Sequence, residues 1–200
     1  DMHAAFGWYF FHLSNIHMAM LDHWPSGTNH FWSLAIQQQF YLIWPFVIWF
    51  LPKKWLAFAI LVFAAIGPAS RYCHDDFLPW FSRPEILTWS AFDYFGLGGL
   101  LALAVHHGMS LESPVLRWVS IIGLAGYLGI FGSHALGWPT YGLRPVQQTF
   151  LSAALCGFIA AGSVGFRGHL GQFLVNPGLQ RIGQVSYGIY LFHNLAPLLT

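Results

Sequence analysis

Apolar segments of roughly membrane-spanning length recur along the chain, and short turns containing proline and glycine separate them. A helix needs about 20 apolar residues to cross the hydrocarbon core of a bilayer. The pattern predicts six spans, at residues 33–51, 55–70, 87–107, 115–132, 146–165 and 183–200. An aromatic segment at residues 4–20 is a candidate seventh. We therefore expect an all-α fold, a polytopic transmembrane bundle of about six to seven helices that forms one domain over residues 1–200.

The basic residues indicate an orientation, because lysine and arginine are enriched in cytoplasmic loops. One set of turns carries five of them: Lys53, Lys54, Arg117, Arg167 and Arg181. The alternate turns carry three: Arg71, Arg83 and Arg144. We therefore expect the turns at residues 21–32, 71–86 and 133–145 to lie outside the cytoplasm.

Composition agrees with a membrane protein. Hydrophobic residues make up 56% of the 200 residues and charged residues only 8%, whereas a soluble domain carries about 25% charged residues. The formal net charge is +1, so no basic surface points to nucleic acid. These values exclude a disordered segment, a nucleic-acid binder and an ordinary soluble domain. We expect an integral, multi-pass protein whose first partner is the lipid bilayer.

The ends of the chain suggest a fragment. It begins at Asp1 without an initiator methionine or a signal-peptide pattern, and it stops at Thr200 within an apolar segment. We expect a domain truncated at both ends.

Polar residues crowd the start of the first clear span. Gln37, Gln38 and Gln39 are consecutive, and at about 100° per residue they sweep roughly 200° of a helix surface. No rotation hides all three from lipid, so protein encloses this helix start or it lies at the headgroups. Ser33 and Tyr41 lie on the same face as Gln37, one turn before and one turn after it.

The last span also has a polar face. Ser186, Tyr190, His193 and Pro197 recur at intervals of four, three and four residues, with Tyr187 and Asn194 one step around the helix. Such a face either packs against another helix through hydrogen bonds or lines a functional cavity.

Asp93 is the one carboxylate well inside an apolar segment, and Gly96, Gly98 and Gly99 follow it. Burial raises the pKa of a carboxyl group unless a cation or hydrogen-bond donors stabilise its charge. An ionisable residue at this depth marks a functional site or anchors two helices by hydrogen bonds.

Metal-ligand patterns are weak. His12 and His17 are five residues apart and do not share a helix face. The run Cys73–Asp76 contains ligand types, but adjacent residues cannot all point at one ion. We expect no metal site.

Three segments carry a family resemblance. The segment HFWSLAIQQQFYLIWP (His30–Pro45) resembles the signature of the membrane acyltransferase-3 family, usually H-x-W-S-L-x-V/I-E-E-Q-F-Y-x-x-W-P. The segment RIGQVSYGIYLFH (Arg181–His193) is similar to the family's late helix. Phe92 and Asp93, with the glycines that follow, resemble the family's F-D-x-x-x-x-G helix. The three matches occur in the family's order.

The resemblance implies an O-acyltransferase of the bacterial inner membrane that has no bound cofactor. It would move an acyl group, usually acetyl, from cytoplasmic acyl-CoA, the donor substrate, to a hydroxyl of an extracytoplasmic glycan or lipid-linked saccharide. The resemblance assigns catalytic roles to four residues: His30, Gln37, Gln38 and Asp93. It assigns substrate binding to five more: Ser33, Tyr41, Ser186, Tyr190 and His193.

Two departures from the family pattern leave alternatives open. Gln37 and Gln38 replace a pair of glutamates, and an amide cannot take up a proton or hold a negative charge. The family's catalytic histidine, eleven positions after a basic residue, is expected before Asp1. One alternative is therefore a catalytically silent member that binds or scaffolds glycan machinery. A transporter is a second alternative, suggested by Asp93 and the 11 histidines.

Overall fold

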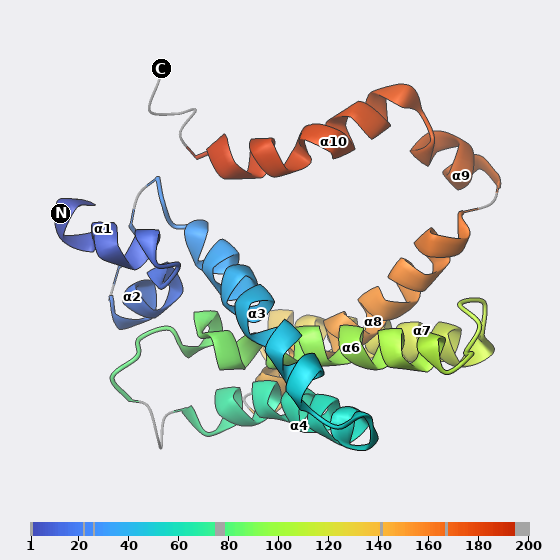
Figure 1. Cartoon of the computed structure of the whole chain (residues 1–200), viewed down its shortest axis with the longest axis horizontal. Coiled ribbons are helices and arrows are strands. Elements are labelled where there is room, and N and C mark those ends of the chain that lie inside the picture. Colours follow the sequence, from blue (N-terminus) through green and yellow to red (C-terminus); the bar gives the residue numbers. More distant parts are fainter. Residues whose placement is uncertain are drawn as a thin grey trace.

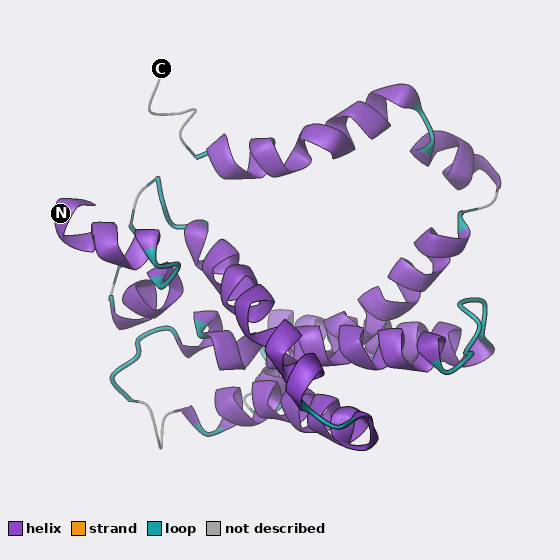
Figure 2. Cartoon of the chain, in the orientation of Figure 1, coloured by secondary structure: helices purple, strands orange, loops and turns teal. Residues whose placement is uncertain are grey.

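The computed structural model describes residues 2–21, 23–25, 27–74, 79–140, 142–166 and 168–194. Helices make up most of this part of the chain, and no strand occurs in it (Figure 2). The expected all-α fold is confirmed. The α-helices are α1 (Met2–Phe10), α2 (Ser14–Met20), α3 (Phe31–Phe50), α4 (Lys53–Tyr72), α6 (Phe92–His106), α7 (Pro114–Ala135), α8 (Arg144–Val164), α9 (Gly168–Leu174) and α10 (Pro177–Phe192). Two 3₁₀ turns, η1 (Pro84–Ile86) and η2 (Thr88–Ala91), precede α6.

Fewer helices than expected meet the requirements for crossing a bilayer. Within the described residues α4, α7 and the continuous segment Thr88–His106 are long and apolar enough, and α8 together with α9 could form a fourth, bent span. For the part of the chain that the structure describes, the expectation of six to seven spans is therefore corrected to three or four. The helix α3 has the required length, but its glutamine triplet lowers its mean hydropathy.

Two expected spans differ in their bounds. Residues 4–20 form the separate helices α1 and α2, because His12 adopts a left-handed conformation with φ 54° between them. The last helix begins at Pro177 rather than at residue 183, since the Asn176 side chain accepts a hydrogen bond from Gly178 N and Pro177 suits the first helical position. Pro197, Asp75, Asp76 and Arg167 lie outside the described residues.

Close helix crossings hold the centre of the bundle together. The pairs α7–α8 and α4–α6 pack side by side (Figure 1). A Cβ atom at Gly96 would lie 2.7 Å from Ala64 Cβ, and one at Gly123 would lie 2.6 Å from Phe150 O. Glycine is required at these crossings because small residues let helix backbones approach within a membrane.

Aromatic stacking attaches α3 to this centre. The Phe40 ring from α3 stacks on Phe95 of α6 with centroids 3.9 Å apart, and Phe63 of α4 stacks on Phe92 of α6 at 3.7 Å. At the other end of α3, Met18, Ala19, Phe81, Ile86 and Leu87 form a small buried cluster that holds α2 against η1. The start of α3 is thus enclosed by protein on one side.

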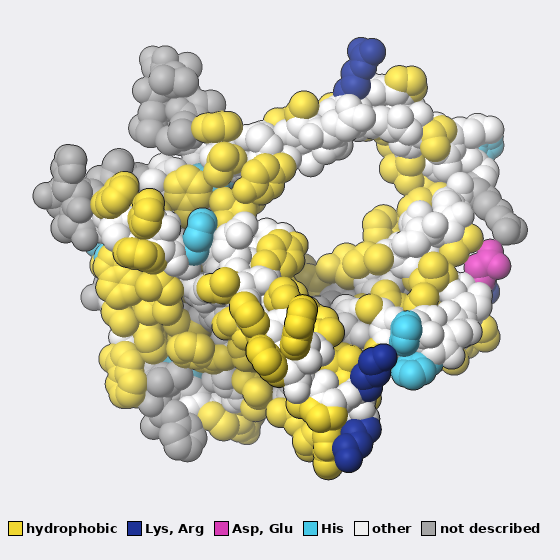
Figure 3. All heavy atoms as spheres, in the orientation of Figure 1, with side chains coloured by type: hydrophobic (Ala, Val, Ile, Leu, Met, Phe, Trp, Pro, Cys, Tyr) yellow, Lys and Arg dark blue, Asp and Glu magenta, His cyan; other side chains and the backbone are white. Residues whose placement is uncertain are grey.

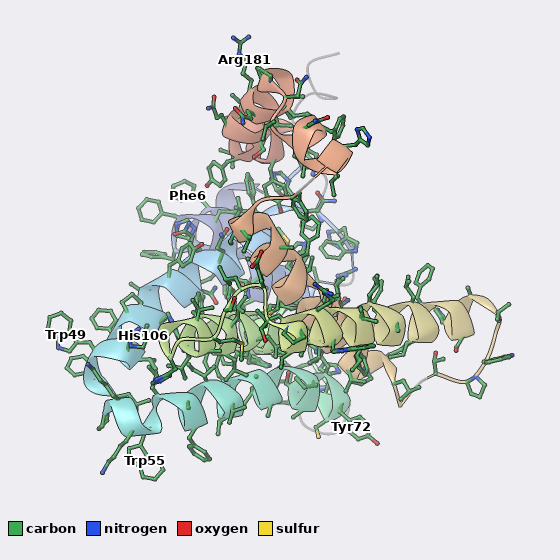
Figure 4. The ribbon with its side chains drawn as sticks, turned by 90° about the vertical axis from the view of Figure 1, so that its right-hand side faces the viewer. Phe6, Trp49, Trp55, Tyr72, His106 and Arg181 are labelled. Carbon is green, nitrogen blue, oxygen red and sulfur yellow. The ribbon has the colours of Figure 1, made fainter. Side chains whose placement is uncertain are left out.

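The turns divide between two ends of the bundle. Trp49, Trp55 and His106 lie at one end and Tyr72 at the other (Figure 4). Arg71 at the second end donates from Nε to Pro145 O at 2.8 Å, so segments expected on the same side of the membrane do lie together. Hydrophobic side chains cover much of the face that Figure 3 shows, and exposed ones in the candidate spans include Leu61, Ile122 and Phe158, as contact with lipid requires.

The helix α10 stands away from the central helices (Figure 1). None of its residues is buried, and Figure 3 shows an opening between it and the helices beneath. Its described contacts with the other helices are at its C-terminal end, where it meets the start of α3.

Candidate functional site

The start of α3 and the end of α10 form a cluster of imidazole, hydroxyl and amide groups. His30, directly before α3, is only 8% exposed. Its Nε2 lies 3.1 Å from Leu191 O, and its Nδ1 lies 2.9 Å from Asn194 Nδ2. A carbonyl oxygen only accepts hydrogen bonds and an amide nitrogen only donates them. His30 therefore carries its proton on Nε2 and accepts at Nδ1.

Two hydroxyl groups strengthen this junction. Tyr190 donates from Oη to His30 O at 3.0 Å, and Ser33 Oγ lies within 3.0 Å of the same oxygen. The two hydroxyls also lie within hydrogen-bonding distance of each other, and because each carries one proton, whichever donates to the other gives up its bond to His30 O. Side chains about 160 residues apart in the sequence thus share one small network.

His193 completes the cluster from the end of α10. Its ring centroid lies 4.9 Å from that of His30 and 5.7 Å from that of Tyr190. Its Nδ1 donates to Tyr190 O at 2.7 Å. We name His30, Ser33, Tyr190, His193 and Asn194 the α3–α10 cluster. It joins four of the nine candidate site residues: His30, Ser33, Tyr190 and His193.

The other candidates on these two helices lie outside the cluster. Gln37 donates from Nε2 to Tyr41 Oη at 2.9 Å, one turn further along α3. Among the described residues the Gln38 side chain makes no hydrogen bond. Ser186 is exposed and donates to Gly183 O within its own helix. The periodicity of α10 suggested that Ser186 joins Tyr190 and His193, but α10 reaches α3 only at its last turn.

Gln39 is a polar contact that the sequence did not single out individually. It donates from Nε2 to His12 O at 2.6 Å and to Asn15 Oδ1 at 2.9 Å, and accepts from Thr88 Oγ1. Asn15, fully buried, donates to Thr88 Oγ1 at 2.9 Å and to Ile86 O at 3.2 Å. This network ties α2 and η2 to α3.

Asp93 lies in the middle of the bundle, where it pairs with Arg71 of α4. Arg71 Nη2 is 2.7 Å from Asp93 Oδ2, Nη1 is 3.1 Å from Oδ1, and Thr149 of α8 donates to Oδ2 at 2.5 Å. Asp93 is 0% exposed and the Arg71 side chain 8%. This geometry is that of an anchor joining three helices; the catalytic role of Asp93 stays a prediction. The sequence offered Arg71 only as a charge that indicates orientation, because its partner is 22 residues away.

Among the described residues, no group of three or more histidine, cysteine or acidic side chains could hold a metal ion. Cys73 and Cys156 are both free thiols. A separate pocket of about 740 Å³ lies between the start of α7 and the end of α8. Leu116, Arg117, Ser120, Phe158 and Val164 are among its lining residues, so it shares no side chain with the α3–α10 cluster.

Comparison with known proteins identifies the family. The family described as acyltransferase domain, acyltransferase 3, matches residues 2–199. The chain belongs to the acyltransferase-3 family. This confirms the resemblance drawn from the three sequence segments, and it makes the protein a member of an integral membrane family of acyltransferases.

Two known proteins are similar to this chain over most of its length. Nodulation protein 10 of Rhizobium leguminosarum bv. viciae is 28% identical over 179 residues, 86% of this chain and 44% of the relative. Peptidoglycan O-acetyltransferase OatA of Listeria monocytogenes is 27% identical over 198 residues, 93% of this chain and 31% of the relative. The chain thus spans less than half the length of either relative. No solved structure matches it.

The acyltransferase-3 motifs coincide with the structural junction. The first motif-bearing segment forms α3 with its preceding turn, and the second lies in α10 and ends at His193. The hydrogen bonds between His30, Leu191 and Tyr190 therefore join the two segments by which the family is recognised.

Proposed function

We propose that this chain is the core of a membrane O-acyltransferase that moves an acyl group, usually acetyl, from cytoplasmic acyl-CoA to a hydroxyl of an extracytoplasmic glycan or lipid-linked saccharide. Membership of the acyltransferase-3 family supports acyl transfer. The similarity to a peptidoglycan O-acetyltransferase supports acetyl as the group and a glycan as the acceptor. The apolar surface and the candidate spans support a multi-pass protein of the bacterial inner membrane. Acyl-CoA acts as substrate, and we propose no resident cofactor.

The observation that carries the proposal is the convergence of the two family motifs in the α3–α10 cluster. Transfer of an acyl group to a hydroxyl requires a base near that hydroxyl and hydrogen-bond donors near the acyl oxygen. The cluster brings two imidazoles, two hydroxyls and an amide within hydrogen-bonding or ring contact of one another. It lies at the end of α3 that the basic residues assign to the outside, where a surface glycan would arrive.

The test is transfer of labelled acetyl from acetyl-CoA to a cell-wall glycan by the full-length protein in membranes. We expect alkali-labile label in the glycan and a strong reduction by Tyr190→Phe, which removes the hydroxyl bonded to His30 O. Tyr187→Phe is the matched control, since Tyr187 is exposed on the same helix and makes no hydrogen bond within the described residues. If a folded wild-type protein transfers no label with any acyl donor and glycan tried, the proposal is contradicted.

Gln37 and Gln38 favour a second candidate, a silent member that binds glycan without acylating it. The Gln37 amide bonds to Tyr41 and cannot ionise. The double substitution Gln37→Glu with Gln38→Glu separates the two functions. A gain of acyl transfer from a silent wild type supports this second candidate, whereas transfer by the wild type that the substitutions do not raise rejects it.

A further inference from the structure

The pocket between the start of α7 and the end of α8 has both apolar and charged walls. Its volume of about 740 Å³ is within the usual range of ligand pockets, about 300–1,000 Å³. Exposed apolar side chains line it, among them Ile121, Phe158 and Val164. Arg117 and Glu112 line it as well, so one positive and one negative charge lie beside the apolar surface. The proposed acyl transfer uses none of these groups.

The inner wall of this pocket is closed by the crossing of α7 and α8. A Cβ atom at Gly157 would lie 2.4 Å from Ser120 Cβ, and Ser120 Oγ donates to Ala154 O at 2.7 Å. Beyond the end of α8, the Phe166 ring lies 5.3 Å from the ring of Phe158. All of the lining residues lie between 111 and 121 or between 157 and 166. An occupant therefore enters from the outer surface of this helix pair, where lipid surrounds the two candidate spans.

The position of Arg117 and Trp118 places the mouth of the pocket at the level of the lipid headgroups. Both follow the first helical residue, Pro114, by about one turn, which is about 5 Å along the axis. Trp118 is 62% exposed, and tryptophan is enriched where a helix meets the membrane–water interface. Arg117 is also exposed. In the part of the chain that the structure describes, its guanidinium has no hydrogen-bond or ion-pair partner, so its donors are available to a ligand.

We propose that this pocket binds one phospholipid of the cytoplasmic leaflet, with a zwitterionic headgroup that carries an amine. The lipid phosphate accepts hydrogen bonds from the Arg117 guanidinium, whose planar donors suit phosphate oxygens. The ammonium group lies toward the Glu112 carboxylate, and an acyl chain lies along Ile121 and Phe158. The two charges of the lining cancel, as do those of the headgroup. Acyl-CoA fits less well, because its several phosphate charges would meet one cation and a carboxylate.

The first experiment measures binding of phosphatidylethanolamine to the full-length protein in detergent by native mass spectrometry. We expect the wild type to retain one lipid, and Arg117→Gln to weaken its binding by about 10–100-fold, the effect of losing a hydrogen bond between charged groups. Arg181→Gln is the matched control, since Arg181 is an exposed arginine outside the pocket. Equal lipid binding by the wild type and Arg117→Gln overturns the proposal.

A second variant tests the apolar part of the pocket. Ala161→Phe places a ring in the pocket, because Ala161 lines it, whereas Ile159→Phe adds a ring at an exposed position of α8 that does not line it. A ligand that binds the folded state raises the melting temperature. We expect added phosphatidylethanolamine to raise it in the wild type and in Ile159→Phe, and not in Ala161→Phe. An equal rise in all three overturns the proposal, and Arg117→Gln decides alone where Ala161→Phe does not fold.

Competition identifies the occupant. We expect excess acetyl-CoA to leave phosphatidylethanolamine bound to the wild type, and phosphatidylglycerol, whose headgroup has a net negative charge, to bind more weakly. Displacement of the lipid by acetyl-CoA would assign the pocket to the acyl donor and overturn the proposal. Phosphatidylglycerol binding as tightly as phosphatidylethanolamine would overturn the zwitterionic headgroup. None of these measurements requires acyl transfer, so their outcome is independent of the proposed function.

Discussion

The Arg71–Asp93 pair and the α3–α10 cluster show two ways in which this protein uses polar groups. The first is buried among α4, α6 and α8, and every donor of the Arg71 guanidinium has an acceptor: Pro145 O, Ser90 O, Thr149 Oγ1 and both carboxylate oxygens of Asp93. The second lies at the rim, where one ring nitrogen of His193 has no protein partner within the described residues. A saturated network suits structure, and an incomplete one is available for chemistry.

Energetics explain the difference. A charge removed from water costs several kcal/mol, and only a well-placed counter-charge with further hydrogen bonds offsets this. The buried charge of Asp93 is therefore stable at the centre of the bundle only with all of its hydrogen-bond and ion-pair partners in place. His193 at the exposed rim has no such requirement, because a neutral imidazole there meets little desolvation. The comparison predicts that substitutions at the pair reduce stability and that substitutions at His193 reduce activity.

The largest expected effect on stability comes from Asp93→Ala. It leaves the Arg71 charge buried without its counter-charge, which costs about 3–5 kcal/mol in the free energy of unfolding. Chemical or thermal unfolding of the detergent-solubilised full-length protein measures the change. The double variant Arg71→Met with Asp93→Leu should recover much of the loss. A single variant as stable as the wild type contradicts the anchoring role.

The next largest loss of stability is expected for Gly67→Ala in α4. A Cβ atom there would lie 2.6 Å from Asp93 Oδ1 and 2.9 Å from Asp93 N, so α4 and α6 must separate and the ion pair must lengthen. We expect a loss of about 3 kcal/mol, the upper part of the usual range for overpacking. Gly98→Ala is the matched control, since a Cβ atom at Gly98 meets nothing within 4 Å. Equal melting temperatures for the two variants count against the close crossing.

A smaller loss is expected for Gln39→Ala, which removes partners from Asn15 and Thr88 inside the α2–α3 contact. An unsatisfied buried polar group costs about 1–3 kcal/mol, and we expect about 2 kcal/mol here. Gln38→Ala serves as control because the Gln38 side chain makes no described hydrogen bond. The free energy of unfolding is measured as for the other variants. An equal loss of stability in Gln39→Ala and Gln38→Ala contradicts the prediction.

The smallest effect concerns His17. Burial lowers the pKa of His17 below its usual value, and its ring stacks on Trp8 with centroids 5.5 Å apart. The unfolded chain then binds the proton more tightly than the folded chain, so this contribution to stability is complete above about pH 6.5 and is lost as the pH falls through the lowered pKa. His17→Phe should flatten this acid dependence in unfolding curves, while exposed His107→Gln should leave it intact. An unchanged slope in His17→Phe counts against the assignment.

The sequence predicted the positions of the helices better than it predicted which helices pack against each other. The apolar pattern predicted α4, α6, α7 and α8 within a few residues, because lipid exposure leaves a strong signal along each helix. It failed at residues 4–20, where the positive φ of His12 interrupts a continuous apolar stretch. Hydrophobicity carries no information on such a backbone break.

The site was partly predictable for a similar reason. Periodicity showed that Tyr190 and His193 are near each other on α10, and the family motif pointed to His30 and Ser33. Neither could show that α10 meets α3 only at its last turn, so Ser186 was grouped with residues that it does not reach. Arg71 was missed as the partner of Asp93 because a helix pattern defines which residues share a face and not which helix packs there.

The most direct test is acetyl transfer from acetyl-CoA to glycan by the full-length protein, measured side by side for the wild type, Tyr190→Phe and Tyr187→Phe. We predict alkali-labile label in the glycan for the wild type and for Tyr187→Phe, and a strong reduction for a folded Tyr190→Phe, which loses the hydrogen bond to His30 O. Wild-type labelling that Tyr190→Phe leaves unchanged would contradict the claim that the α3–α10 cluster takes part in acyl transfer.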